Sequence, residues 1–226
     1  MPLAENLRGK LVAGDIRSPL RRRDHATHRN ELTAEDLNGF EQEVAEAFNA
    51  GKIRAPVHLS GGNEEKLIDL FRLFISHDDW IFCTYRNHHL ALLHDIPRER
   101  VMDEILAGRS QNLSFPEHRF LASAMVGGIL PIAVGVALAL KRKSEHSRNV
   151  WCFIGDMAAT TGAFAEARYY AGGHDLPINF VVEDNGMSCD SPTKACWGSG
   201  LPKPFTRYVY ERRWPHINTG KWITFK

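Results

Sequence analysis

The clearest regular pattern along the chain is a set of apolar residues near its beginning, spaced three or four positions apart. The set is Leu37, Phe40, Val44, Ala47 and Phe48. Such spacing places the side chains on one face of an α-helix. Thr33 and Asp36 precede the set with the spacing of a capping box, in which each side chain bonds the other residue's backbone N–H. The pattern therefore predicts a helix over about 34–50.

Two more helices are predicted before residue 110. One covers about 63–76, and the other covers 97–107, with Pro97 suited to a first helical turn and Gly108 to a stop. The short apolar segment 81–84 fits a strand between them.

The second half of the chain has the pattern of a strand, a helix and a second strand. Residues 150–154 and 178–182 are short, apolar and rich in β-branched or aromatic residues, and 164–170 between them is helical in character. The almost wholly apolar stretch 129–140 predicts a helix that must be buried. Strands joined by a helix run parallel in a covered sheet. The fold class predicted is α/β, a parallel sheet with helices on both faces.

The chain has 226 residues, a length at which one core can bury roughly 70% of the unfolded surface. Its composition of 43% hydrophobic and 24% charged residues excludes disorder, collagen and coiled coil. Residues 1–32 mix Gly, Pro, Arg and His without periodicity. We expect an irregular arm there, lying on the body or on a neighbouring chain, followed by one domain over 33–226.

Charge and cysteine content limit which kinds of partner and which cellular compartment are expected. A net charge of +1 supplies no field for a polyanion, so no nucleic-acid partner is expected. The four cysteines lack C-x-x-C spacing and no signal-peptide pattern precedes them, so we expect free thiols and a cytoplasmic protein. The longest apolar stretch is well short of the ~20 residues that span a bilayer, so no membrane segment is expected.

Polar residues follow both strands of the predicted strand–helix–strand unit. Ligands of open parallel sheets bind beyond the carboxyl ends of the strands. Gly155 and Asp156 follow the first strand and Asn185 follows the second, and a right-handed crossover brings both side-chain oxygens to one crevice. Such oxygens suit Mg²⁺, which keeps other positions for water and phosphates, so a diphosphate ligand is implied. The alternative is that Asp156 caps a helix and Asn185 shapes a turn.

These residues also resemble a known motif. Gly155-Asp156 and the later Asn185 are similar to the thiamine diphosphate motif, whose usual form is Gly-Asp-Gly and then Asn-Asn. From about Leu32 onward the chain resembles the alpha subunits of two-subunit 2-oxo acid dehydrogenases of the pyruvate or acetoin type. Four segments carry the resemblance, in order: PVHLS at 56–60, TYRNH at 84–88, VGGILPIAVG at 126–135 and VEDNG at 182–186. The resemblance implies the thiamine diphosphate-binding fold.

The resemblance also implies roles for individual residues. Asp156 and Asn185 would be side-chain ligands of Mg²⁺, with the backbone oxygen of Met187 as a third ligand. Tyr85 and Arg86 match a pair directed at the cofactor diphosphate, for which a guanidinium is well suited. The other expected cofactor contacts are Ala124, Val126, Gly155, Met157 and Ala158, with the backbone of Val126 at the aminopyrimidine and the amides of Met157 and Ala158 at the diphosphate.

Histidines are the candidates for catalysis. His88, in a Tyr-Arg-x-His context, is the first candidate for proton transfer or for contact with a substrate carboxylate, because imidazole titrates near working pH. His58 is the second catalytic candidate and His118 follows it. A structural role is the alternative for both of these.

The chain departs from the family pattern at three places. Met157 replaces the last Gly of the triplet, Asp184 replaces the first Asn of the pair, and Ala124 stands where the family often has Gly. We also expect the family's His-bearing segment beyond the metal motif to be absent, which leaves the acyl acceptor open.

The implied function is that of an alpha-type subunit of a thiamine diphosphate- and Mg²⁺-dependent enzyme. It would decarboxylate a 2-oxo acid or transfer an aldehyde-level unit from a related donor. The alternatives are a split transketolase or acyloin-forming subunit and a non-catalytic scaffold, whereas a Rossmann enzyme is disfavoured because no G-x-G-x-x-G follows a strand. The family's activating Glu would come from a beta-type subunit in a heterotetramer.

Overall fold

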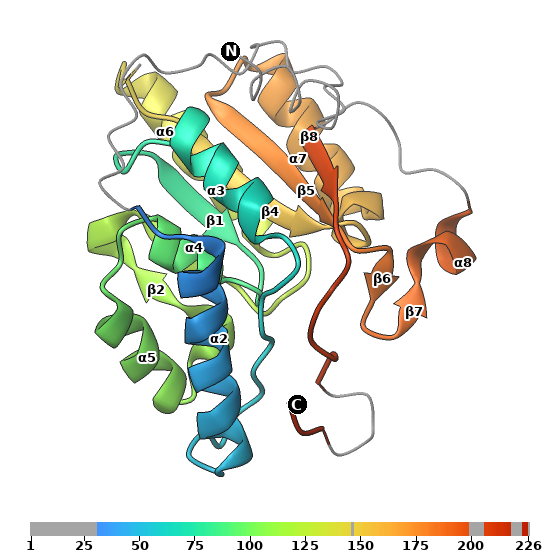
Figure 1. Cartoon of the computed structure of the whole chain (residues 1–226). Helices are drawn as coiled ribbons and strands as arrows, with labels where there is room; N and C mark the ends of the chain where they lie inside the picture. The colour runs from blue at the N-terminus through green and yellow to red at the C-terminus, as the bar shows by residue number, and fades with distance from the viewer. Residues whose placement is uncertain (1–30, 146, 199–205, 218–222, 226) are drawn as a thin grey trace, which may run out of the picture.

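A twisted sheet with helices packed around it forms the centre of the molecule (Figure 1). The computed structural model describes residues 31–145, 147–198, 206–217 and 223–225. The six-stranded sheet has the order β2-β3-β1-β4-β5-β8. Neighbouring strands pair parallel from β3 to β8, whereas β2 pairs antiparallel with β3. Its strands are β1 (Trp80–Cys83), β2 (Ser114–Phe115), β3 (Phe120–Ala122), β4 (Val150–Gly155), β5 (Ile178–Asp184) and β8 (Thr206–Val209).

Helices precede or connect most of these strands. The helices are α2 (Ala34–Asn49), α3 (Glu64–Leu73), α4 (His88–Leu93), α5 (Arg98–Leu106), α6 (Ile129–Arg142), α7 (Gly162–Gly173) and α8 (Thr193–Trp197). Short 3₁₀ turns occur at Ser110–Asn112, Pro116–His118 and Ala158–Thr160. The hairpin of β6 (Met187–Ser188) and β7 (Ser191–Pro192) extends with α8 to one side of the sheet (Figure 1).

Alternate residues of the central strands enter two separate cores. In β4, Trp151 and Phe153 join the cluster formed with α2, α3, α4 and α5. Val150, Cys152 and Ile154 join the cluster formed with α6 and α7. Since successive strand residues point to opposite faces, both faces of the sheet are covered. The predicted parallel sheet with helices on both faces is confirmed.

The predicted helices and central strands are all present. Helix α2 begins with the predicted capping box: Asp36 N donates to Thr33 Oγ1 at 3.2 Å, and Thr33 N donates to Asp36 Oδ2 at 2.8 Å. The strand–helix–strand unit is β4-α7-β5, and its pairing register sets Gly155 opposite Glu183. Helix α3 is shorter than predicted, because its last turn ends at Leu73 rather than near 76.

One expectation about burial was wrong. Helix α6 buries only one face, through residues such as Ile129, Ala133 and Ala137, whereas Ile132 on the outer face is 46% exposed. Its sequence is apolar all round, so the pattern could not reveal that only half of it packs on this chain.

Other expectations concern the thiols, the membrane and the arm. The four cysteines are free, as predicted; Cys83 and Cys152 are buried and Cys189 and Cys196 are exposed. Within the described part of the chain, every helix is too short or too polar to cross a bilayer. The expected arm over 1–32 lies outside the described residues except for its last two positions.

Candidate functional site

A narrow cavity of about 50 Å³ lies where the parallel strands β1, β4 and β5 end. Its lining residues come from five parts of the chain that the sheet brings together. They are Thr84, Tyr85 and Arg86 after β1; Gly155 at the end of β4 with Asp156, Met157 and Ala158 after it; Glu183, Asn185, Met187, Ser188 and Cys189 around the end of β5; Tyr210 and Arg212 after β8; and Val126 before α6. Most of the predicted cofactor and metal residues therefore share one cavity.

Asp156 lines the cavity with a buried carboxylate, and only 2% of the residue is exposed. Burial raises the pKa of Asp156, and the neighbouring charge of Asp184 raises it further, while a hydrogen bond donated by the Thr193 hydroxyl opposes the rise. A cation beside the carboxylate would offset this cost of desolvation. The alternative role as a helix cap is wrong for α7, because its cap is Thr161, whose Oγ1 accepts from Phe164 N at 3.3 Å.

Asn185 shapes a turn and still faces the cavity. Its Oδ1 accepts a hydrogen bond from Met187 N at 3.0 Å, and its Nδ2 donates to the Tyr210 hydroxyl at 3.2 Å. Gly186, between Asn185 and Met187, has φ +70°, a left-handed conformation that favours glycine. The turn interpretation is thus confirmed. An amide oxygen has two lone pairs, so Oδ1 keeps one for a metal ion.

The donors around this turn suit Mg²⁺ better than a softer metal. Asp156, Asn185 and Met187 all line the cavity and would supply oxygen ligands. In the described ranges, no group of three or more His, Cys, Asp or Glu side chains is placed to hold a metal. Mg²⁺ does not need such a cage, because it usually takes one or two carboxylates and completes its shell with water and phosphate oxygens. The residues present therefore fit a magnesium diphosphate.

Arg86 is the cation of the cavity with the best-defined orientation. Its Nη1 donates to the Leu59 carbonyl at 2.9 Å, and its Nη2 lies 3.0 Å from His216 Nδ1. The neighbouring Tyr85 ring lies 5.7 Å from the guanidinium carbon. A guanidinium has five N–H donors, so two bonds to protein leave others for an anion. Tyr85 and Arg86 both line the cavity that Asp156 and Asn185 also line.

His58 lies behind Tyr85 rather than on the cavity wall. Its ring centroid is 4.3 Å from that of Tyr85 and 4.5 Å from that of His216, and its Nδ1 is 2.8 Å from Gln111 Nε2. Burial lowers the pKa of His58 to about 2, and the charge of Arg86 contributes. His58 is therefore a neutral imidazole near the site.

His88 is enclosed in the core, away from the cavity lining. Its Nδ1 lies 3.0 Å from Glu41 Oε2, and its Nε2 lies 2.9 Å from Ser110 Oγ. Both ring nitrogens are thus used inside the protein. This environment favours a structural role over the predicted proton transfer. His118, the third candidate, ends a 3₁₀ turn and also lies outside the lining.

Val126 and Ala124, two of the predicted cofactor contacts, lie in different places relative to the cavity. Val126 lines the cavity and is 56% exposed, as expected of a residue that meets a ligand or a second chain. Ala124 lies outside the lining, and its N–H donates to Asn112 Oδ1 at 2.9 Å. That amide is therefore already used within the chain.

Glu183 lines the cavity, yet sequence reasoning gave it no role. It accepts hydrogen bonds from the Tyr208 hydroxyl and from Asn63 Nδ2, the latter at 3.1 Å. Burial raises the pKa of Glu183 to about 7, against the lowering effect of its hydrogen bonds and of Arg86. The available signal was a charged residue that directly follows the apolar run Phe180 to Val182 in β5.

Residues 33–196 match the dehydrogenase E1 component family, and this match covers more than half of the chain. The chain belongs to this family. It is 32% identical over 163 residues to the alpha subunit of the pyruvate dehydrogenase E1 component of Porphyra purpurea, covering 65% of this chain and 47% of that protein. It is also 32% identical over 168 residues to the alpha subunit of the acetoin:2,6-dichlorophenolindophenol oxidoreductase of Bacillus subtilis (strain 168), covering 70% and 50%.

The resemblance seen in the sequence is thus confirmed at the level of the E1 family. The chain spans about half the length of these curated relatives. The E1 match ends at residue 196, so Tyr210, Arg212 and His216 lie outside it.

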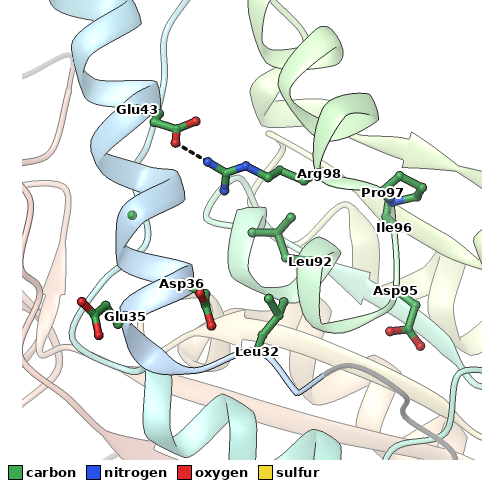
Figure 2. Close-up of a pocket in the computed structure, with 10 residues that line it drawn as sticks. Leu32, Glu35, Asp36, Glu43, Leu92, Asp95, Ile96, Pro97 and Arg98 are labelled. Carbon is green, nitrogen blue, oxygen red and sulfur yellow. Dashed lines mark ion pairs between the residues drawn. The ribbon is translucent and has the colours of Figure 1, made fainter.

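A second groove, about 670 Å³ in volume, lies between the start of α2 and the loop before α5 (Figure 2). Leu32, Leu92 and Ile96 give it an apolar floor, and carboxylates stand on its rim. Asp36 belongs to the α2 capping box, and Glu43 pairs with Arg98. Because these charges serve the fold and no predicted site residue lines the groove, we assign it no function.

Proposed function

We propose that this chain is the diphosphate-binding, alpha-type part of a thiamine diphosphate- and Mg²⁺-dependent E1 enzyme. The observation that carries the proposal is the convergence of Asp156, Asn185 and Arg86 on one cavity at the carboxyl edge of a parallel sheet, in a chain of the E1 family. Hard oxygens and a guanidinium at one edge suit a magnesium diphosphate.

The residues of the chain would divide the work of holding the cofactor. Asp156 and Asn185 would hold Mg²⁺ with the backbone oxygen of Met187, and Arg86 would neutralise the remaining phosphate charge beside Tyr85. Thiamine diphosphate, when bound, supplies the carbanion chemistry, while the protein supplies orientation and electrostatics.

The donor substrate would be a 2-oxo acid or a related small carbonyl compound. The relatives named for pyruvate dehydrogenase and for acetoin oxidoreductase support this substrate class. Two neutral imidazoles, His58 and His216, lie beside Tyr85 and outside the cavity lining, so they add no positive charge that would repel a cationic thiazolium.

The cavity of this chain is too small to hold the whole cofactor. Pockets for molecules of this size usually measure about 300–1,000 Å³, and this one measures about 50 Å³. We therefore propose that a beta-type subunit completes the site and supplies the activating Glu, in a heterotetramer of two alpha and two beta chains. Exposed apolar residues around the cavity mouth and on α6 and α7 support this: Met125, Val126, Ile132, Tyr169 and Tyr170.

Cofactor titration with and without the partner tests the proposal. Isothermal calorimetry of this chain, alone and coexpressed with a beta-type chain of the E1 family, should show Mg²⁺-dependent binding of thiamine diphosphate that tightens with the partner. Release of carbon dioxide from a 2-oxo acid should require both chains. A failure of both preparations to bind the cofactor in the presence of Mg²⁺ would reject the proposal.

A further inference from the structure

The segment after β8 closes one side of the cofactor cavity. Strand β8 pairs with β5 in parallel, and Tyr210 N continues the pairing with a bond to Asp184 O at 2.9 Å. The chain then runs past Gly61, whose carbonyl accepts from Arg213 N at 3.3 Å. This path carries Tyr210 and Arg212 to the cavity and His216 to within hydrogen-bonding distance of Arg86.

His216 accepts a hydrogen bond from Arg86. The two groups are 3.0 Å apart, from Nη2 of the guanidinium to Nδ1 of the imidazole. A guanidinium can only donate, so Nδ1 must be the acceptor, and the proton of the neutral ring is then on Nε2. Only 4% of His216 is exposed, and its ring is flanked by His58 at 4.5 Å and Tyr85 at 6.0 Å between centroids. The packing therefore fixes both the ring and its tautomer.

The charges around His216 keep it in this acceptor state. Burial lowers the pKa of His216 to about 4, and the positive charges of Arg86 and Arg212 act in the same direction, whereas Asp190 opposes them. The other rings against it, His58 and Tyr85, are neutral at pH 7, since burial lowers the pKa of His58 and raises that of Tyr85. At neutral pH His216 is thus an uncharged acceptor facing a cation.

We propose that His216 is a positioning residue that, with the Leu59 carbonyl, orients the Arg86 guanidinium toward the bound diphosphate. Leu59 and His216 engage Nη1 and Nη2, and both residues lie outside the lining of the cavity that Arg86 faces. The remaining N–H groups of the guanidinium are then left for phosphate oxygens. The proposal rests on the proposed function, because it takes the diphosphate as the ligand of Arg86.

Variants of His216 test the role of the acceptor. His216→Phe keeps an aromatic ring but removes Nδ1, whereas His216→Asn places an amide oxygen near the position of Nδ1. Titration of the full chain with Mg²⁺ and inorganic pyrophosphate, and then with Mg²⁺ and thiamine diphosphate, should show about tenfold weaker binding by His216→Phe. His216→Asn should remain within about threefold of the parent. Trp214→Phe, a buried aromatic change in the same segment, is the matched control and should bind like the parent.

A double-mutant cycle separates positioning from general packing. If His216 acts through Arg86, His216→Phe should weaken pyrophosphate binding in the parent but have no further effect in an Arg86→Ala background. An equal loss in both backgrounds, or parent-like binding by His216→Phe, would overturn the proposal while leaving the proposed function intact. If the parent binds neither pyrophosphate nor thiamine diphosphate in the presence of Mg²⁺, both alone and with its beta-type partner, this proposal and the proposed function are both overturned.

A measurement on the unmodified chain does not depend on the folding of variants. Nitrogen-15 NMR of the histidine rings should show His216 as the neutral Nε2–H tautomer from pH 6 to 8. A proton on Nδ1, or a charged ring at pH 6, would overturn the proposal.

Discussion

Glu41 and His88 form a fully buried pair, with Oε2 of the carboxylate 3.0 Å from Nδ1 of the imidazole. Ser60 N also donates to the Glu41 carboxylate, at 2.9 Å. The residue before Ser60 is Leu59, whose carbonyl accepts from Arg86. The pair therefore fastens α2 and α4 to the segment that holds the arginine of the site, although neither member touches the cavity.

The first prediction concerns the stability that this pair contributes. Removing one partner of a buried pair leaves an uncompensated polar or charged group, so Glu41→Ala should lower the free energy of unfolding by about 3–5 kcal/mol. Glu43→Ala is the matched control on the same helix, because Glu43 is exposed and pairs with Arg98 at the surface. That change should cost less than about 1 kcal/mol. Urea denaturation at pH 7 measures both, and equal losses would contradict the structural role of the pair.

The same pair predicts a dependence on pH. Burial alone would raise the pKa of Glu41, but the charge and hydrogen bond of His88, with the Ser60 N–H, lower it below its ordinary value of 4.5. A carboxyl group with a lowered pKa stabilises the fold above its unfolded pKa and loses that contribution as pH falls through the folded pKa. The stability gap between parent and Glu41→Ala should be constant from pH 7 to 5 and should narrow below about pH 4.5. A gap that narrows already between pH 7 and 5 would contradict this assignment.

Local patterns explain why much of the fold could be predicted. The capping box of Thr33 and Asp36 joins residues within one helical turn, and the apolar spacing of α2 repeats every turn. Both features can therefore be read directly from the sequence. The convergence of Asp156 and Asn185 followed from a general rule of parallel sheets. Helix α4 has only six residues, which is too few for a helical period to show, so the sequence pattern does not predict it.

Long-range pairings explain what could not be predicted. His216 lies 130 positions from Arg86 in the sequence, and no local pattern links them. The burial of His88 depends on Glu41 and Ser110, which reach it from two other segments. A Tyr-Arg-x-His context therefore suggested chemistry for His88, whereas packing assigns it to the core.

Asp156→Ala should abolish most of the Mg²⁺-dependent cofactor affinity without unfolding the chain. Replacement of a residue behind a metal ligand already costs about 10–100-fold, so loss of the ligand itself should cost at least about 100-fold. Because burial raises the pKa of Asp156, its ionised form is not a source of stability, and the melting temperature without ligand should not fall appreciably. Asp103→Ala, an exposed change on α5, is the control. Calorimetric titration with Mg²⁺ and thiamine diphosphate measures the effect, and unchanged affinity would reject the metal assignment.

Arg86→Lys should bind the cofactor about tenfold more weakly although it keeps the positive charge. Lysine cannot reproduce the planar fork that reaches Leu59 O and His216 Nδ1 while still contacting phosphate. Arg72→Lys on α3 provides the matched surface control. Equal dissociation constants for Arg86→Lys and the parent would show that charge alone is sufficient.

Glu183→Gln should stabilise the protein at high pH and not at low pH. Burial raises the pKa of Glu183 from 4.5 to about 7, so the folded state disfavours ionisation and loses stability as pH rises through this window. A shift of this size corresponds to roughly 3 kcal/mol at pH 8. Glutamine keeps an oxygen that can accept from Tyr208 and Asn63, as Oε1 does now. Urea denaturation at pH 5 and 8 tests the prediction, with the exposed Glu166→Gln as control; a gap that does not grow with pH would contradict the raised pKa.

Ile132→Asp should prevent assembly with the beta-type partner while leaving the isolated chain folded. Ile132 is 46% exposed on the outer face of α6, beside small apolar residues, and an apolar face of this kind is typical of the core of a subunit interface. Leu106→Asp is the matched control, since Leu106 is 41% exposed at the end of α5, on the opposite face of the sheet. Size-exclusion chromatography of each variant coexpressed with the partner should show separate chains for Ile132→Asp and an intact complex for Leu106→Asp. An intact complex with Ile132→Asp would show that the interface does not include this face of α6, so the activating Glu would have to approach from another side.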